Sequence, residues 1–282
     1  MPELPEIQAI VEGLHAVCVG RRIVSAHALH PSVVRSVAPG LDDLVDRPIT
    51  GIWRRGKLIG IDCDGLSAVI HLMQSGRIGL ATPPLRRPGK IVAVVLTLDD
   101  GSELRLREAA TEHRASLTVV PTDEIDKIGH LAHLGPEPIG LSPAKWRERL
   151  ATPPGRLSTA IREGRRVAGI GRAYASDILW AAKLPPFART DRLSDEQWER
   201  LAKAADTVLS QALDRARAQI TTDMPTNERR VTAVHGHFGD PCLRCGRALA
   251  RVSFEGYELV YCPTCQTDGK VYADRRLSRL LK

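Results

Sequence analysis

The sequence predicts an α+β protein of several domains, with a β-rich first half, a helical region and a small metal-binding segment near the C-terminus. Three observations lead to this fold class. Short apolar segments separated by turn residues fill residues 22–120. Apolar residues recur with helical spacing from Ser142 onward. Four of the six cysteines then form two Cys-x-x-Cys pairs between residues 242 and 265.

The first six residues, MPELPE, contain two prolines and two carboxylates. Pro5 suits the first position of a helix and Glu6 suits its positive end, so we expect a helix to start here. Pro2 follows Met1, and a small second residue normally allows Met1 to be removed. Pro2 would then carry a secondary amine, and an α-amino group with a pKa of about 7.7–8.0 is partly neutral and nucleophilic near pH 7. On this stretch alone, a plain helix start is favoured over a catalytic amine.

The composition is that of a globular protein with polyanionic partners. The chain has 282 residues, 43% of them hydrophobic, and a net charge of +7, although membrane surfaces or solubility could also explain the charge. No apolar run approaches the roughly 20 residues of a membrane helix, and no secretory signal is present. We therefore expect a cytoplasmic, monomeric protein without membrane association. Cys18 and Cys63 stand alone in apolar stretches and are expected to be inert core thiols.

The β-rich part is expected to be a β-sandwich or a barrel, because its strands are many and short. Residues 99–101, Asp-Asp-Gly, are expected to form a hairpin turn. Residues 135–140 are rich in proline and glycine and form the best domain boundary. The expected strands are 22–26, 49–53, 58–62, 68–72, 91–98, 103–107 and 117–120.

The helical part contains four expected helices. The first follows a cap at Ser142, and the others cover residues 156–163, 172–182 and 195–218. A glycine-flanked turn at residues 169–171 leads into the third helix. Such a turn presents backbone N–H groups that suit a phosphate, although many helix corners contain glycines for steric reasons only.

The cysteine pairs near the C-terminus predict one structural zinc ion. The two pairs are separated by 16 residues, which is the spacing of a four-cysteine zinc site, and a β-hairpin is expected between them. Four thiolates saturate zinc and leave no open position for catalysis. A redox pair or an accidental cluster is the alternative. The expected ligands are Cys242, Cys245, Cys262 and Cys265.

Together these motifs resemble the formamidopyrimidine-DNA glycosylase / endonuclease VIII (Fpg/Nei) family over nearly the full length, and Leu4 resembles the Fpg branch. The resemblance implies a β-sandwich domain with flanking helices (1–130), a helix–two-turns–helix domain (131–233) and a zinc finger (234–282). It also implies that damaged double-stranded DNA lies between them. The matching segments are residues 2–6, 54–57, 71–76, 133–138, 167–171 and 234–236.

The resemblance implies a base-excision-repair DNA glycosylase with abasic-site lyase activity. The Pro2 nitrogen would attack C1′ of the damaged nucleoside and expel the base, with Glu3 protonating the sugar ring oxygen. The resulting iminium would allow β- and δ-elimination. Glu6 would position the N-terminus or the helix start, and Lys57 would bind a phosphate or the sugar near C1′. With Met1 attached, the Pro2 nitrogen is a tertiary amide and cannot attack.

The chain departs from the family at two phosphate-contacting positions. Arg172, directly after Gly171, stands where the family normally has Asn. Tyr257, at the tip of the zinc hairpin, stands where the family normally has arginine. We expect these changes to compensate, with Arg172 restoring the charge and Tyr257 contributing only a hydroxyl or a stacking face.

The residues that fill the vacated base stack in the Fpg branch also differ. Gln74 stands at the Met position, and His113 and Arg114 are possible substitutes in a loop without an aromatic wedge. The excised base is therefore left open. Two other hypotheses remain at this point: a family member that binds lesions or abasic DNA with little base excision, and an unrelated zinc-ribbon nucleic-acid binder.

Overall fold

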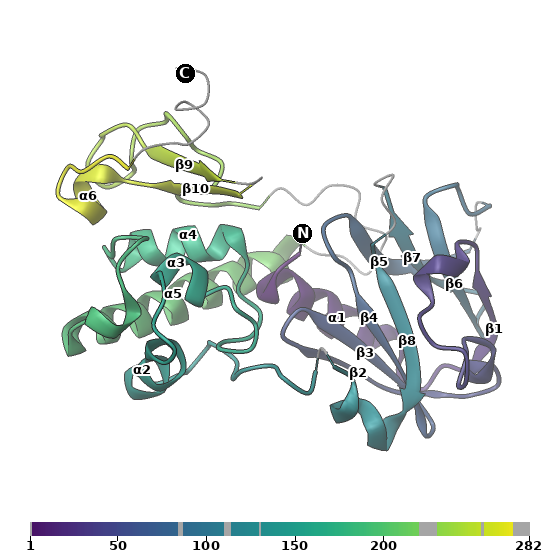
Figure 1. Ribbon diagram of the computed structural model, residues 1–282. Coiled ribbons are helices and arrows are strands. Elements are labelled where there is room, and N and C mark those ends of the chain that lie inside the picture. The colour runs from purple at the N-terminus through teal and green to yellow at the C-terminus, as the bar shows by residue number, and fades with distance from the viewer. Residues whose placement is uncertain are drawn as a thin grey trace. The chain divides into compact units, whose positions relative to one another are not determined.

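The computed structural model describes residues 2–83, 87–109, 114–129, 131–219, 230–254 and 257–272 (Figure 1). The chain divides into two compact units, unit 1 with Met1–His133 and Leu213–Arg229, and unit 2 with Leu134–Ala212 and Arg230–Lys282. Within the described residues, no helix is sufficiently long and apolar to traverse a lipid bilayer.

Unit 1 begins with helix α1, Leu4–Cys18, which starts one residue before the expected position at Pro5. Its side chains at Ile7, Ile10 and Leu14 are buried, because they recur with the helical period on one face. The last part of the long helix α5 also belongs to this unit. There Arg217 donates from Nε and Nη2 to the two Glu12 oxygens of α1, both over 2.8 Å.

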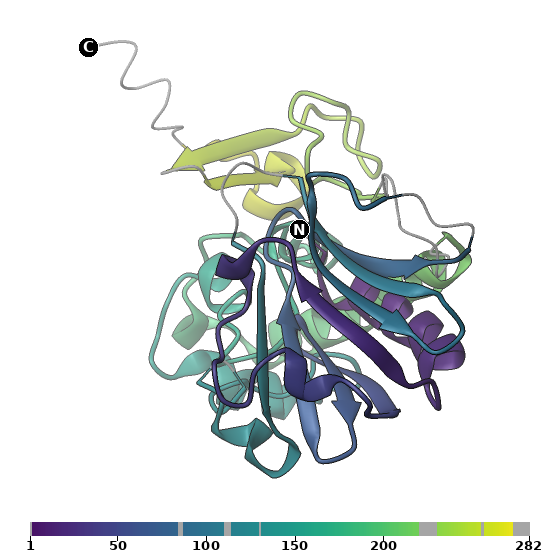
Figure 2. The same cartoon turned by 90° about the vertical axis from the view of Figure 1, so that its right-hand side faces the viewer.

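Two antiparallel four-stranded sheets form the rest of unit 1, as Figure 1 and Figure 2 show. Residues of both sheets and of α1 share one hydrophobic core. The expected β-sandwich is therefore confirmed, and the barrel is not formed. One sheet has the order β2 (Ile49–Arg55), β3 (Leu58–Cys63), β4 (Leu66–His71), β8 (Ser116–Pro121), and the other has the order β1 (Ile23–Ala28), β6 (Val92–Leu98), β7 (Glu103–Glu108), β5 (Gly76–Ala81).

One strand was missing from the sequence prediction. Strand β5 contains two glycines, Gly76 and Gly79, which weaken the strand pattern in the sequence. It forms because it pairs along its length with β7. Gly76 is required for space, since a Cβ there would lie 2.3 Å from the Leu72 carbonyl oxygen. The short 3-10 helices η1 (Pro31–Val33) and η2 (Asp42–Leu44) lie between β1 and β2, and η3 (Thr122–Lys127) follows β8.

Unit 2 has a helical part around a second core. Helix α2 (Pro143–Ala151) is capped as expected, because Ser142 Oγ accepts from the Lys145 N–H over 3.3 Å. Trp146 and Trp198 are almost fully buried in this core. The second helix is shorter than the expected 156–163. The other elements are α3 (Leu157–Ala160), α4 (Arg172–Ala181), η4 (Thr190–Arg192) and α5 (Asp195–Gln219).

The cysteine-rich part of unit 2 is a hairpin followed by a short helix. Strands β9 (Ala250–Phe254) and β10 (Tyr257–Tyr261) pair antiparallel, as expected, and helix α6 (Pro263–Thr267) follows. Helix α4 packs against both β10 and α6 (Figure 1). The finger and the helical part therefore form one compact unit.

Candidate active site and nucleic-acid interface

The N-terminal stretch is buried and held by its own helix start. Pro2 is buried, and Glu3 is only 2% exposed. Glu6 Oε2 accepts a hydrogen bond from the Glu3 backbone N–H over 2.8 Å, as half of a capping box at the start of α1. The Glu6 carboxylate is thereby bonded to the backbone nitrogen of the residue that follows Pro2.

The turn that carries Lys57 is tied to the same helix. Arg54 Nε donates to Gln8 Oε1 over 2.8 Å, and Arg54 Nη1 donates to the Gly56 carbonyl over 2.9 Å. Gly56 adopts φ 58°, the left-handed conformation that this turn between β2 and β3 requires. Because Gln8 is the fifth residue of α1, the contacts of Arg54 hold the turn with the half-buried Lys57 near the N-terminal end of this helix.

The two candidate stack-filling residues are joined through one buried carboxylate. Glu108, 2% exposed at the end of β7, accepts at Oε1 from Ser75 Oγ (3.0 Å) and from the Arg114 N–H (2.9 Å). Both Glu108 oxygens also lie within hydrogen-bond distance of the Ala115 N–H, at 3.1 and 3.0 Å. Gln74, next to Ser75, and Arg114 are both exposed and are brought to the same region of unit 1.

In unit 2, the glycine turn before α4 packs against the backbone of residues 135–136. Gly169 adopts φ 83°, and Gly171 is the N-cap residue of α4, so half-exposed Arg172 is the first residue of the helix. The Ala168 N–H donates to the Pro136 carbonyl over 2.9 Å. A Cβ on Gly135 would lie 2.3 Å from the Arg166 carbonyl oxygen. Close backbone contact therefore explains why glycine precedes proline in this motif.

Asp177, in the middle of α4, holds the segment that leads into the finger. Its carboxylate accepts three backbone N–H groups, from Ala233 (2.8 Å), Val234 (3.1 Å) and His235 (3.2 Å). Burial raises the pKa of Asp177, while the three N–H donors act in the opposite direction.

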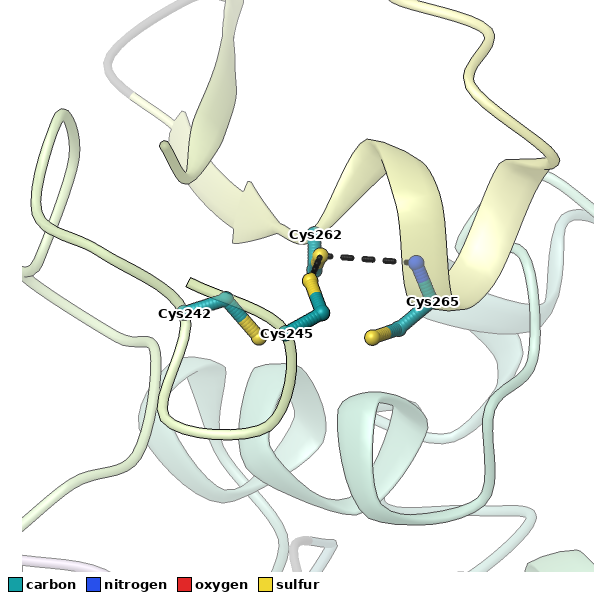
Figure 3. A group of neighbouring side chains, drawn as sticks. All are labelled: Cys242, Cys245, Cys262 and Cys265. Atoms are coloured by element: carbon teal, nitrogen blue, oxygen red, sulfur yellow. Dashed lines mark hydrogen bonds between the residues drawn. The ribbon is translucent and has the colours of Figure 1, made fainter. Parts of the chain in front are cut away.

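The four expected zinc ligands lie together, as Figure 3 shows, with their sulfur atoms within 4.8 Å of one another. A tetrahedral site with Zn–S bonds of about 2.3 Å has sulfur–sulfur separations of about 3.8 Å, so these thiols fit one zinc ion after small movements. Burial raises the pKa of Cys242, but hydrogen bonds from the Arg244 N–H and the Trp180 indole outweigh it and lower the pKa to about 6. By contrast, burial raises the pKa of both Cys18 and Cys63 to about 12, as expected for inert core thiols.

Tyr257 lies on β10 opposite Phe254, at the end of the hairpin. Its side chain is outside the described part of the chain, and so are residues 110–113 beside Arg114. The compensation between Arg172 and Tyr257 therefore stays a prediction.

Three family models match successive parts of the chain. The N-terminal domain of formamidopyrimidine-DNA glycosylase matches residues 1–112, the H2TH domain of the same enzyme matches 134–224, and the zinc finger found in FPG and IleRS matches 239–267. The formamidopyrimidine-DNA glycosylase of Geobacter sulfurreducens is 32% identical over 280 residues, which cover 94% of this chain and 100% of the relative. This chain belongs to the Fpg/Nei family. The resemblance inferred from the sequence, including the zinc finger with its one structural zinc, is confirmed.

Other similar proteins include a formamidopyrimidine-DNA glycosylase from Mycolicibacterium gilvum, 32% identical over 288 residues with 96% of this chain and 100% of the relative covered. A protein of Mycobacterium tuberculosis described as an uncharacterized formamidopyrimidine-DNA glycosylase-like protein is 42% identical over 149 residues, covering 53% of this chain and 94% of the relative.

Solved structures support the same fold. The Lactococcus lactis Fpg in complex with DNA containing N7-benzyl-Fapy-dG has a TM-score of 0.85 at 26% identity, covering 94% of this chain and 100% of the other. The same protein with abasic-site DNA has a TM-score of 0.82 at 26% identity, covering 94% and 99%.

Several residues that organise the site were not identified from the sequence. Arg54 was noted only as part of a motif, and its hydrogen bond to Gln8 connects segments that lie 46 residues apart in the chain. Glu108 and Asp177 are acids beside apolar residues. In the sequence this is the sign that each carboxylate is buried and hydrogen-bonded.

Proposed function

We propose that this Fpg/Nei family member is a base-excision-repair DNA glycosylase with abasic-site lyase activity, and that Pro2 is its nucleophile. The observation that carries the proposal is the N-terminal start itself. A buried Pro2 is followed by a buried Glu3, and Glu6 fixes the backbone between them through the Glu3 N–H. A plain helix start has no need to bury two carboxylates beside a chain end.

Removal of Met1 gives Pro2 a secondary amine. Its nitrogen bonds to C1′ of the damaged nucleoside, and the bond from C1′ to the base breaks with its electron pair leaving on the base. The proton that the amine nitrogen loses neutralises the departing base. Glu3 gives a proton to the sugar ring oxygen as the ring opens, and the nitrogen lone pair completes an iminium ion. The Glu3 carboxylate that remains is then able to accept a proton.

The iminium ion makes the C2′ proton acidic. Its removal breaks the C3′–O bond and releases one phosphate, which is β-elimination. A second elimination breaks the C5′–O bond in the same way and releases the other phosphate, so the strand is left with a gap. Hydrolysis of the iminium returns the free Pro2 amine.

Glu6 and Lys57 have supporting roles in this reaction. The hydrogen bond from the Glu3 N–H to Glu6 fixes the direction of the Pro2–Glu3 peptide, so the amine and the acid keep their relative geometry. Lys57, held at the start of α1 by the Arg54 contacts, binds a phosphate or the sugar near C1′.

Unit 2 contributes phosphate binding. The N–H groups at the start of α4 and the Arg172 guanidinium offer positive charge to the phosphate next to the lesion. Tyr257, in place of the usual arginine, adds a hydroxyl or a stacking face. Gln74 and Arg114 of unit 1 enter the stack that the extruded base leaves, a step in which unstacking costs a few kcal/mol.

The partner is damaged double-stranded DNA. The DNA complexes of the similar Lactococcus lactis protein and the net charge of +7 support this partner. We further propose a cytoplasmic, nucleoid-associated monomer with domains at 1–130, 131–233 and 234–282. The family models at 1–112, 134–224 and 239–267 support this division.

A second candidate is a protein that binds lesions or abasic DNA with little base excision. Arg172 and Tyr257, which replace the usual Asn and Arg, favour it. Trapping with borohydride on an oligonucleotide that carries one abasic site separates the two. Mass spectrometry first establishes that Met1 is absent. A covalent adduct with the wild-type protein that is lost in Pro2→Gly supports the enzyme, and tight binding without any adduct supports the lesion-binding protein.

A further inference from the structure

The zinc finger and helix α4 meet at Trp180, in the last turn of the helix. The Trp180 indole N–H donates to Cys242 Sγ over 3.3 Å. Arg244, two residues after Cys242, places its guanidinium 4.2 Å from the centre of the Trp180 ring and donates from Nη1 to the Trp180 carbonyl over 3.1 Å. The indole is therefore held on both its polar edge and its face.

Cys242 is one of the four zinc ligands, so this contact reaches the metal through a single sulfur atom. The Arg244 backbone N–H also approaches Cys242 Sγ, at 3.5 Å. Groups that donate to a metal ligand fix its direction and tune the charge that it offers to the metal, and their loss typically weakens metal binding about 10–100-fold. A tryptophan that served only to fill space would have no need to direct its N–H at this sulfur.

The same helix has two further functional contacts along its length. Asp177, about one turn before Trp180, accepts the three N–H groups of residues 233–235, which lead into the finger. Arg172 is the first residue of this helix of 10 residues. Because a helix of this length is a stiff rod of about 15 Å, a shift at its C-terminal end is transmitted to its N-terminal end.

We propose that Trp180 is an outer-shell partner of the zinc ion and that the metal, acting through Cys242 and Trp180, holds helix α4 in the position from which Arg172 binds phosphate. The link from Trp180 to zinc stands on the contacts above. The link from zinc to DNA binding rests on the proposed function. In this arrangement Trp180 is a positioning residue, and the reacting atoms are not in contact with it.

The first test measures zinc release. The zinc-loaded full chain is mixed with an excess of a coloured chelator, and the rate of metal transfer is followed by absorbance. Trp180→Phe keeps an aromatic ring but removes the N–H, so release should become about tenfold faster or more. The matched control is Trp146→Phe, since the buried Trp146 indole nitrogen has no hydrogen-bond partner among the described residues. Equal rates for wild type and Trp180→Phe would overturn the proposal.

The second test uses tryptophan fluorescence, which responds to the surroundings of the Trp180 indole beside Cys242. Zinc removal should change the emission of the wild-type chain and of Trp146→Phe, because both retain the indole beside Cys242. In Trp180→Phe most of this change should disappear. A zinc-linked change of the same size in all three proteins would place the response at another tryptophan and overturn the proposal.

The third test addresses the link to DNA. Binding to duplex DNA with an uncleavable abasic analogue is measured with all variants saturated with zinc. Trp180→Phe should weaken binding severalfold, and combining it with Arg172→Ala should add little, because Trp180 affects DNA binding through the position of Arg172. Fully additive effects would remove the link between zinc and Arg172. Borohydride trapping by the wild type tests the proposed function separately, so failure there leaves the zinc-release result intact.

If Trp180→Phe does not fold, Arg244→Ala provides another test. Arg244→Ala removes the guanidinium above the ring but retains the indole N–H and the backbone N–H of residue 244. We expect zinc release faster than in the wild type, because Trp180 loses the group that holds its face. An unchanged release rate in a folded Arg244→Ala protein counts against the proposal.

Discussion

The backbone N–H of Glu3 donates to the Glu6 carboxylate over 2.8 Å, while both residues are buried. This relationship makes the N-terminus of the chain part of the folded core. Chain ends are usually frayed, and a nucleophile at a frayed end would sample many directions. Here the first helical turn restrains the Pro2–Glu3 peptide, and in the proposed mechanism this orients the Pro2 amine before DNA binds.

Replacing Glu6 should therefore affect stability and chemistry together. Glu6→Ala leaves the buried Glu3 N–H without its acceptor, and the free energy of unfolding should fall by about 1–3 kcal/mol. The Pro2 amine should also lose its orientation, so single-turnover borohydride trapping should slow. Glu6→Gln keeps an acceptor oxygen and should lie closer to the wild type in both measurements. Urea unfolding with trapping on the same preparations checks this, and an Ala variant with normal trapping would contradict it.

Glu108 should matter more for base excision than for strand cleavage. Glu108→Ala removes the acceptor of Ser75 Oγ and of the N–H groups at residues 114 and 115, so both segments beside Gln74 and Arg114 should lose their fixed position. In the proposed function Gln74 and Arg114 fill the stack that an extruded base leaves, whereas a preformed abasic site has no base to extrude. We expect excision from damaged duplex to slow at least tenfold, with a smaller effect on cleavage of the abasic site.

Glu103→Ala is the matched control for Glu108. Glu103 lies on the same strand, β7, forms an ion pair with Arg105 over 2.6 Å, and is paired in the sheet with Ala81 and Thr97, away from residues 74–75 and 114–115. Its replacement should lower stability without changing the ratio of excision to abasic-site cleavage. If both variants change this ratio equally, Glu108 has no particular positioning role.

Asp177 should make the protein less stable as the pH rises. Burial raises its pKa, so the folded state holds this proton more tightly than the unfolded chain, whose Asp pKa is about 3.9. The stabilisation is fully present below that unfolded value and is lost as the pH rises through the folded pKa. The free energy of unfolding of the wild type minus that of Asp177→Asn should therefore fall as the pH rises above about 4.

Urea unfolding of the two proteins at matched pH values measures this difference. Both retain the four cysteine ligands, so the pH dependence of zinc binding cancels when one value is subtracted from the other. A difference that grows with rising pH would mean that the three N–H donors outweigh burial and that the pKa is lowered.

The fold was largely predictable because its signals are local. The capped helix after Ser142, the hairpin between the cysteine pairs and most strands follow from neighbouring residues alone. Strand β5 was not, because Gly76 and Gly79 hide its pattern and its pairing with β7 decides its structure. The motif residues of the site were found through their spacing and family resemblance. The supports at Arg54, Glu108 and Trp180 were not, because their contacts with Gln8, Ser75 and Cys242 span 46, 33 and 62 residues of sequence.

Replacing Arg172 tests the proposed phosphate-binding role of helix α4. A cation at a helix N-terminus opposes the macrodipole by about 0.3–1 kcal/mol, so Arg172 is unfavourable for the isolated helix. In the proposed function a DNA phosphate bound there offsets this cost. Arg172→Ala should weaken binding to abasic-analogue DNA and reduce the slope of log K against log salt by about 1, the value for one phosphate contact. Arg147→Ala is the control, since Arg147 is exposed and pairs with Asp195 over 2.7 Å on the same unit. Its salt slope should match the wild type. An unchanged slope in Arg172→Ala would show that this arginine does not replace the usual phosphate contact, and Tyr257→Phe would then be the next variant to measure.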